Sequence, residues 1–332
     1  MTSHRRRSAR IIGALVGSAL TVAMISAQQS PDTPVFRVES TGVEVDVSVK
    51  RGNRPVTGLT AADFVVIDNG VPHQVERVSV DAMPIDLTLV LDRSGSTVNI
   101  LSYIQRHAER ILGLLRPVDR VRILVLDSSV IEILPQQTVG RELALLQTLE
   151  TGRLSSVRDA IVAALVSRAE PGRRRLVVAM TDGADTKSIT TAQTMFNVGR
   201  QTDAVLHVIG VRSLNGVPGA TAVSTSRPTV PMPDFFARPT MTNQEWNLFE
   251  DLAGLTGGEF HGTKHDSKSD RTIDAVRELR KAFNDFRQRY LLRFQPENVD
   301  EAGWHALTVK VKGIDAKGVR ARRGYFTGVT PP

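Results

Sequence analysis

The hydrophobic pattern of the chain changes near residue 85. Before it, residues 41–50 alternate valine with polar residues, which is typical of a strand buried on one face. Short apolar runs at Phe64–Asp68 and Gln74–Val80 flank an Asp-Asn-Gly turn, so residues 35–80 are expected to form a small antiparallel β unit. After residue 85, nearly continuous apolar runs predict strands covered on both faces. These runs are Ile85–Leu91, Val121–Leu126, Leu176–Met180 and Ala204–Val211.

Segments with helical periodicity lie between these runs, and a short run at Ile131–Leu134 suggests an edge strand. The alternation predicts an α/β domain over residues 84–288, with a doubly wound, mostly parallel sheet. Strand patterns return in residues 289–332 and are expected to pack with residues 28–83 as a small β-sandwich-like unit. The helical segments are Ile100–Leu115, Arg141–Leu149, Val157–Arg168, Thr190–Arg200, Gln244–Leu255 and Thr272–Tyr290, and the final strand runs are Leu291–Phe294, Ala306–Val311 and Val319–Phe326.

Residues 1–27 have the pattern of a secretory signal peptide. Four arginines precede an apolar run from Ile11 to Ile25, and Ala27 is a suitable small residue before the cleavage site. We expect cleavage after Ala27, with an uncleaved membrane anchor as the alternative. The mature protein is then exported to the periplasm, the cell surface or the medium, without membrane insertion.

The net charge and the cysteine content exclude several classes of function. Removing the four arginines of residues 1–27, a segment with no acidic residue, lowers the formal net charge from +7 to +3. Nucleic-acid binding therefore loses its main compositional support. The chain has no cysteine, which excludes disulfides, thiolate metal sites and cysteine nucleophiles. An exported protein without cysteine is more typical of a bacterial envelope than of a eukaryotic extracellular module.

Carboxylate and hydroxyl residues follow two of the expected core strands. Asp92-Arg93-Ser94-Gly95-Ser96 follows the first strand, and Thr181-Asp182-Gly183 follows the strand at Leu176–Met180. Ligands of open α/β sheets bind at the carboxyl ends of strands, and hard divalent cations prefer oxygen ligands. These residues therefore predict a metal site. The alternative is that the first motif only caps the following helix.

The two motifs resemble the metal ion-dependent adhesion site of von Willebrand factor A domains, which reads Asp-x-Ser-x-Ser, a threonine from a middle loop, and an aspartate in Thr-Asp-Gly. The resemblance covers roughly residues 84–288 and implies metal ligation by Asp92, Ser94, Ser96 and Asp182.

The middle ligand departs from the family pattern. The alignment of Asp159 and Ala160 with the family motif puts Ser155 at the threonine position, with Thr151 and Ser156 as alternatives. Arg93 also differs from the smaller residue that is common in the family.

The resemblance implies a bound Mg²⁺ or Mn²⁺ with one open coordination position, which an Asp or Glu of a protein partner completes. The N-terminal segment of residues 56–70 and the C-terminal Arg-Arg-Gly-Tyr-Phe are similar to an exported bacterial family related to von Willebrand factor A. We therefore expect a non-enzymatic adhesion module that binds its protein partner through the metal. A proline-containing loop over residues 212–243 is expected above the same edge. Its Phe235 and Phe236 are candidate contacts for the partner, although packing within the loop is the favoured alternative for both side chains.

Three other interpretations remain open. The domain could be structural, with a site that has lost its metal. A phosphatase-like hydrolase would use Asp92 as its nucleophile, but Ser94 stands where such enzymes usually have a second acid. A second metal site at His261, His265 and Asp266 rests on a weak pattern, and solvated loop residues are the default interpretation. The run of residues 173–175 is expected to be a solvated basic loop.

Overall fold

The computed structural model describes residues 42–80, 83–94, 104–138, 149–150, 152, 154–167, 170–210, 243–262, 275–299 and 302–327. The expected signal peptide, most of the proline-containing loop and four residues of interest lie outside this part of the chain. These four residues are Ser96, Thr151, His265 and Asp266.

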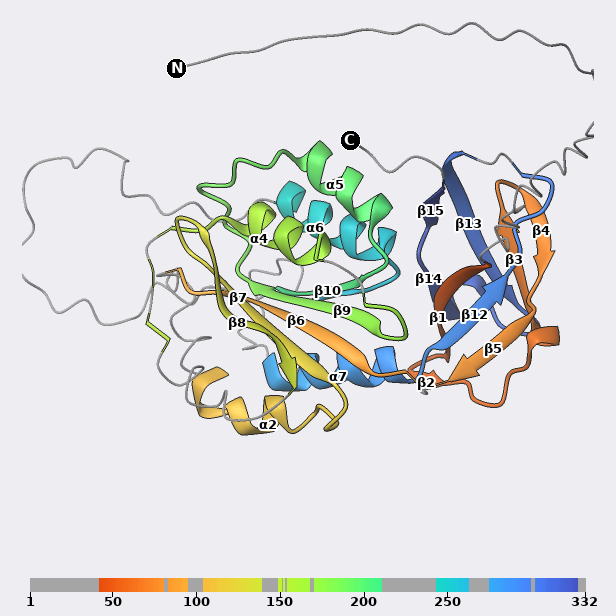
Figure 1. Ribbon diagram of the computed structural model, residues 1–332, viewed down its shortest axis with the longest axis horizontal. Helices are drawn as coiled ribbons and strands as arrows, with labels where there is room; N and C mark the ends of the chain where they lie inside the picture. The colour runs from red at the N-terminus through yellow and green to blue at the C-terminus, as the bar shows by residue number, and fades with distance from the viewer. Residues whose placement is uncertain are drawn as a thin grey trace, which may run out of the picture. The chain divides into compact units, whose positions relative to one another are not determined.

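A six-stranded sheet forms the centre of the α/β unit (Figure 1). Its strand order is β11-β10-β9-β6-β7-β8, and all neighbours are parallel except the edge strand β8, which is antiparallel to β7. The strands are β6 (Ile85–Asp92), β7 (Arg120–Leu126), β8 (Val130–Thr138), β9 (Arg174–Thr181), β10 (Val205–Gly210) and β11 (Phe260–His261).

Helices cover both faces of this sheet, which confirms the predicted α/β class (Figure 1). One face packs against α2 (Ala108–Leu112) and α7 (Ala275–Arg287). The other packs against α4 (Val157–Leu165), α5 (Ala192–Gln201) and α6 (Asn243–Leu255). Every residue of β6 and β9 is buried, as the continuous apolar runs predict for strands covered on both sides.

Strands from the two ends of the chain pair in two further antiparallel sheets, whose inner faces share one hydrophobic core. The first has the order β14-β1-β12-β5, with β2 paired to the end of β1, and the second has the order β15-β13-β3-β4. The strands are β1 (Val43–Arg51), β2 (Arg54–Pro55), β3 (Phe64–Asp68), β4 (Val71–Gln74), β5 (Arg77–Val80), β12 (Tyr290–Phe294), β13 (Gly303–Val311), β14 (Val319–Ala321) and β15 (Gly324–Thr327). The boundaries at residues 83/84 and 288/289 stay predictions.

Some element boundaries differ from the sequence pattern. The runs Gln74–Val80 and Val319–Phe326 are each divided between two sheets, because the chain crosses from one sheet to the other within them. Tyr290 begins β12, whereas helical periodicity had extended the last helix to it. Tyr290 lies four residues after the buried Phe286, so helical spacing alone does not reveal that α7 has ended.

The expectation of a solvated basic run at residues 173–175 was wrong. Arg174 and Arg175 are buried within β9. Arg174 pairs with Asp46 of β1, and Arg175 pairs with Asp203 before β10. The partners lie far away in the sequence, so the local pattern could not reveal that these charges are neutralised. Among the described residues, no helix is long and apolar enough to cross a membrane.

Candidate functional site

Asp92 is the last residue of β6 and is buried at the carboxyl edge of the central sheet. Its Oδ1 accepts a hydrogen bond from the backbone N–H of Ser94 at 2.9 Å. Its Oδ2 accepts hydrogen bonds from the hydroxyl of Ser155 at 3.2 Å and from the hydroxyl of Thr181 at 2.7 Å. Hydrogen-bond donors from three separate segments therefore meet at one carboxylate.

Asp182 enters the same region from the turn that follows β9. Its side chain is buried, and its Oδ1 accepts a hydrogen bond from the backbone N–H of Ala184 at 3.1 Å. The next residue, Gly183, has a φ of +78°, a conformation that glycine adopts readily. The N–H of Gly183 donates a hydrogen bond to the Thr181 hydroxyl at 2.8 Å, and the same hydroxyl donates to Asp92. The turn therefore orients Thr181 toward Asp92.

The structure brings Ser155 to Asp92 and directs Ser156 elsewhere. The backbone of Ser155 is held from two sides, because its N–H donates to the Thr186 hydroxyl and its carbonyl accepts from Thr186 and Lys187. The hydroxyl of Ser156 donates instead to the backbone carbonyl of Asp127 at 3.0 Å. Ser94 and Ser155 thus both lie beside Asp92, while Ser96 and Thr151 lie outside the described residues.

The electrostatics of this cluster fit a divalent cation. Burial, followed by the nearby charge of Asp182, raises the pKa of Asp92 to about 6. A bound cation would relieve the repulsion between these two buried carboxylates. The neighbouring side-chain donors are hydroxyl oxygens, which suit the hard ions Mg²⁺ and Mn²⁺. In the described part of the chain, no three His, Cys, Asp or Glu side chains gather to hold a metal, so a cation at this edge would need hydroxyl ligands as well.

Two other acidic residues near this edge hold the loop after β9 against α4. The carboxylate of Asp159 accepts hydrogen bonds from the backbone N–H groups of Ile189 at 3.0 Å and Thr190 at 2.8 Å. Burial alone would raise the pKa of Asp159, but the hydrogen bonds from Thr190 and its neighbours lower it. Asp185 pairs with Arg158 at 3.0 Å. We therefore assign both carboxylates a structural role.

Sequence reasoning missed the contributions of Thr181 and Asp127. Thr181 belongs to the recognised Thr-Asp-Gly motif, but its contact with Asp92 was not anticipated. Asp127 directly follows β7, and its Oδ2 pairs with the guanidinium of Arg93 at 3.0 Å. Both residues lie at or directly after the end of a core strand, and this position is the signal in the sequence that could have identified them.

His261 lies at a different place, beside a second buried histidine. Its Nε2 lies 2.8 Å from Nδ1 of His207, and its Nδ1 lies 3.5 Å from a carboxylate oxygen of Glu278. Burial lowers the pKa of both rings, so neutral side chains are favoured. The other members of the weak second metal pattern, and Phe235 and Phe236, lie outside the described residues.

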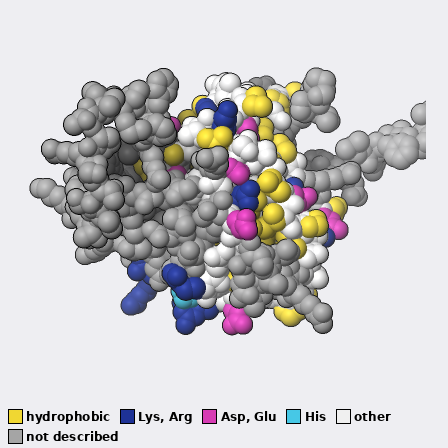
Figure 2. Space-filling view, turned by 90° about the vertical axis from the view of Figure 1, so that its left-hand side faces the viewer, with side chains coloured by type: hydrophobic (Ala, Val, Ile, Leu, Met, Phe, Trp, Pro, Cys, Tyr) yellow, Lys and Arg dark blue, Asp and Glu magenta, His cyan; other side chains and the backbone are white. Residues whose placement is uncertain are grey.

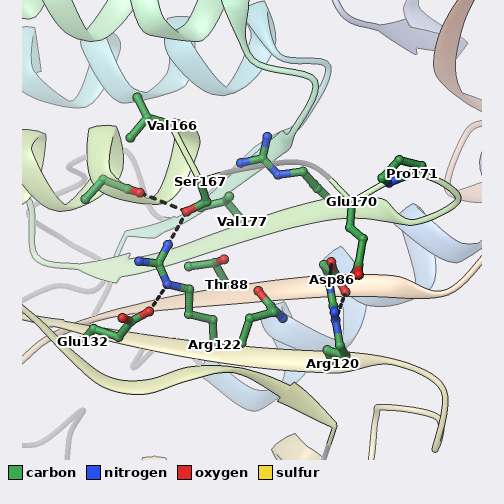
Figure 3. A pocket seen from close by; sticks show the side chains of 13 residues that line it. Asp86, Thr88, Arg120, Arg122, Glu132, Val166, Ser167, Glu170, Pro171 and Val177 are labelled. Carbon is green, nitrogen blue, oxygen red and sulfur yellow. Dashed lines mark hydrogen bonds and ion pairs between the residues drawn. The ribbon is translucent and has the colours of Figure 1, made fainter. Parts of the chain in front are cut away.

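A pocket of about 670 Å³ opens near the amino ends of β6, β7 and β9, away from Asp92 (Figure 3). Arg122 lies between Glu132 and Ser167, and Arg120 pairs with Asp86 and Glu170. The described arginines that line the pocket are therefore already paired with acids.

On the face shown in Figure 2, basic and acidic side chains of described residues are interspersed, with one basic group at the lower edge.

Comparisons with solved structures give distant likenesses. A von Willebrand factor type A protein from Catenulispora acidiphila is 9% identical, with 88% of this chain and 76% of that chain covered and a TM-score of 0.44. The conserved hypothetical protein BatB from Bacteroides thetaiotaomicron is 14% identical, with 61% and 98% covered and a TM-score of 0.44. The pilus adhesin SpaC from Lactobacillus rhamnosus GG is 9% identical, with 72% and 34% covered and a TM-score of 0.41. No family model matches the chain, and no curated protein matches its sequence.

Proposed function

We propose that this protein is an exported, non-enzymatic binding module that holds a divalent cation at the carboxyl edge of its central sheet. The observation that carries the proposal is the buried carboxylate of Asp92, which receives hydroxyl groups from Ser155 and Thr181. Asp182 lies near enough for its charge to raise the pKa of Asp92.

We also propose that the central sheet is doubly wound. When its strands are numbered along the chain, with β6 as strand 1 and β11 as strand 6, their order in the sheet is 3-2-1-4-5-6, as in doubly wound folds.

Five residues would hold the ion, which we propose is Mg²⁺ or Mn²⁺. When bound, the ion supplies positive charge and a coordination position that accepts a carboxylate oxygen. The proposed partner is therefore a protein that offers Asp or Glu, outside the cytoplasm. Thr181 and the turn at Gly183 would keep Asp92 and Asp182 oriented toward the ion. The proposed ligands are Asp92, Ser94, Ser96, Ser155 and Asp182.

Calorimetric titration with Mn²⁺ and Mg²⁺ tests the metal site. We expect one saturable site in the wild-type protein, and loss of binding in Asp182→Asn because that substitution removes one of two buried negative charges. Asp251→Asn is the matched control, since Asp251 is 61% exposed and lies in α6. No saturable binding by the wild type would contradict the proposal and favour a structural domain.

A second titration tests the proposed use of the ion. The probes are two synthetic peptides that differ only by one Glu→Gln substitution, presented to the protein in Mn²⁺ or in EDTA. The proposal predicts that the glutamate peptide binds more tightly than its glutamine counterpart in Mn²⁺, and that EDTA removes the difference. Equal binding of both peptides in Mn²⁺ would contradict coordination of an acidic partner group.

A further inference from the structure

A positively charged residue lies within the segment that carries two of the proposed cation ligands. Arg93 follows Asp92 in the sequence and precedes Ser94, and its guanidinium pairs with Asp127 at 3.0 Å. Its backbone also belongs to this edge, because its N–H approaches the carbonyl of Leu126 at 3.4 Å. An unpaired guanidinium here would repel a cation by Coulomb interaction.

Asp127 contacts both this arginine and the segment that carries Ser155. Its Oδ2 lies 3.0 Å from Nη2 of Arg93, and its Oδ1 accepts a hydrogen bond from the N–H of Leu154 at 3.2 Å. Leu154 immediately precedes Ser155, whose hydroxyl reaches Asp92. The Asp127 side chain is 18% exposed, so solvent screens its charge only partly.

Gly152 shows how closely this segment packs against the carboxylate. Its N–H donates to the carbonyl of Arg93 at 2.6 Å. A side chain at this position would place its Cβ 2.6 Å from Cγ of Asp127, which is closer than atoms are tolerated. The backbone carbonyl of Asp127 also receives the hydroxyl of Ser156 at 3.0 Å. Asp127 therefore lies against Gly152, Leu154 and Ser156.

We propose that Asp127 is a positioning residue for the cation site, and this inference rests on the proposed function. One carboxylate oxygen neutralises Arg93, so that its charge does not oppose the cation. The other fixes Leu154, so that Ser155 reaches Asp92. Asp92 and Asp182 then hold the cation, whereas Asp127 holds the arginine and the segment that carries Ser155.

Asp127→Asn separates the two tasks, because an amide keeps an acceptor oxygen for Leu154 and loses the negative charge. We expect its Mn²⁺ dissociation constant to rise by about tenfold, since the charge of Arg93 is no longer neutralised. Arg93→Gln added to Asp127→Asn is expected to restore the constant to within about threefold of the wild-type value. Asp127→Ala loses the acceptor as well, so Arg93→Gln is expected to rescue it less.

Calorimetric titration of the full chain with Mn²⁺ measures these constants, and thermal unfolding in EDTA checks that each variant is folded. Glu132→Gln is the matched control, because it unpairs Arg122 at a distant position on β7 and β8. Equal Mn²⁺ affinity for the wild type and Asp127→Asn would overturn this inference alone. Failure of Arg93→Gln to rescue Asp127→Asn would overturn the neutralising role. Absence of Mn²⁺ binding by the wild type would overturn the proposed function and this inference together.

Discussion

The hydroxyl of Ser155 donates a hydrogen bond to the carboxylate of Asp92 at 3.2 Å, across 63 residues of chain. Ser155 directly precedes Ser156, the N-cap residue of α4, while Asp92 ends β6. The same serine is fixed by Thr186 in the loop after β9. Through its hydroxyl and its backbone, Ser155 thus joins three segments at the edge of the sheet, and its neighbour Ser156 donates to a different acceptor.

Ser155→Ala and Ser156→Ala are predicted to have different effects. Ser155→Ala removes a proposed ligand, so Mn²⁺ affinity falls. Ser156→Ala removes only the hydrogen bond to the Asp127 carbonyl, so it lowers the free energy of unfolding by about 1 kcal/mol and leaves Mn²⁺ affinity nearly unchanged. Calorimetric titration and urea unfolding of both variants measure this contrast. A larger loss of affinity in Ser156→Ala would assign the middle ligand to Ser156 instead.

The pKa of Asp92 predicts an unusual pH dependence of stability in EDTA. Burial and the charge of Asp182 raise this pKa from 3.8 to about 6, so the folded state holds the proton more tightly than the unfolded state. Protonation of Asp92 therefore stabilises the folded state. Its contribution to the free energy of unfolding is about 3 kcal/mol below about pH 4 and is lost as the pH rises through 6.

Asp92→Asn has no carboxyl group to titrate and is the control for this effect. Urea unfolding in EDTA from pH 4 to 8 gives the free energy of unfolding of both proteins. The wild-type value minus the variant value is expected to decrease as the pH rises through this window. A difference that stays constant with pH would show that Asp92 has an ordinary pKa.

Asp285 of α7 is predicted to be a major source of stability, because its buried carboxylate contacts one buried and two partly exposed cations. It accepts a hydrogen bond from the Ser48 hydroxyl at 2.7 Å and pairs with Lys50 at 2.6 Å, both in β1. Arg289 and Arg320 approach it at 2.7 and 3.1 Å. Asp285→Asn leaves these charges without their carboxylate, so we expect the free energy of unfolding to fall by about 3 to 5 kcal/mol.

Urea unfolding at neutral pH measures this loss, with Asp251→Asn as the control. The side chains of Asp251 and its partner Arg323 are 61% and 59% exposed, so their pair is expected to contribute less than about 1 kcal/mol. Burial alone would raise the pKa of Asp285, but Arg289 and then Arg320 hold it well below its usual range. Its contribution is therefore present above the ordinary carboxyl pKa and is lost in strong acid. Equal losses in the two variants would contradict the assigned role.

The hydrophobic pattern of the sequence was sufficient to predict the site residues that lie at the carboxyl ends of core strands. Asp92 and Asp182 each follow a continuous apolar run, and the carboxyl ends of parallel strands meet at one edge, so their proximity was foreseeable. The same reasoning applies to Asp127, which directly follows β7, but Asp127 lies outside the recognised motifs, so no motif marks its carboxylate.

Other features of the structure depend on contacts between residues that are far apart in the sequence, which a local sequence pattern does not reveal. The burial of Arg174 is possible because Asp46 approaches it from a strand 128 residues away. The end of α7 follows from the packing of Tyr290 against Phe64, with ring centroids 5.2 Å apart, and not from a break in helical spacing. The choice of Ser155 over Ser156 likewise depends on Thr186 and Asp127, which are distant in the sequence.

The central claim is that Asp92 and Asp182 bind a divalent cation, and thermal unfolding in EDTA, Mg²⁺ and Mn²⁺ tests it most directly. Because an ion that binds only the folded state stabilises it, a concentration 100 times the dissociation constant adds about 2.7 kcal/mol. We predict that Mg²⁺ or Mn²⁺ raises the unfolding temperature of the wild-type protein and leaves that of Asp182→Ala unchanged. Identical unfolding curves for the wild type in EDTA and in millimolar Mg²⁺ and Mn²⁺ would contradict the claim.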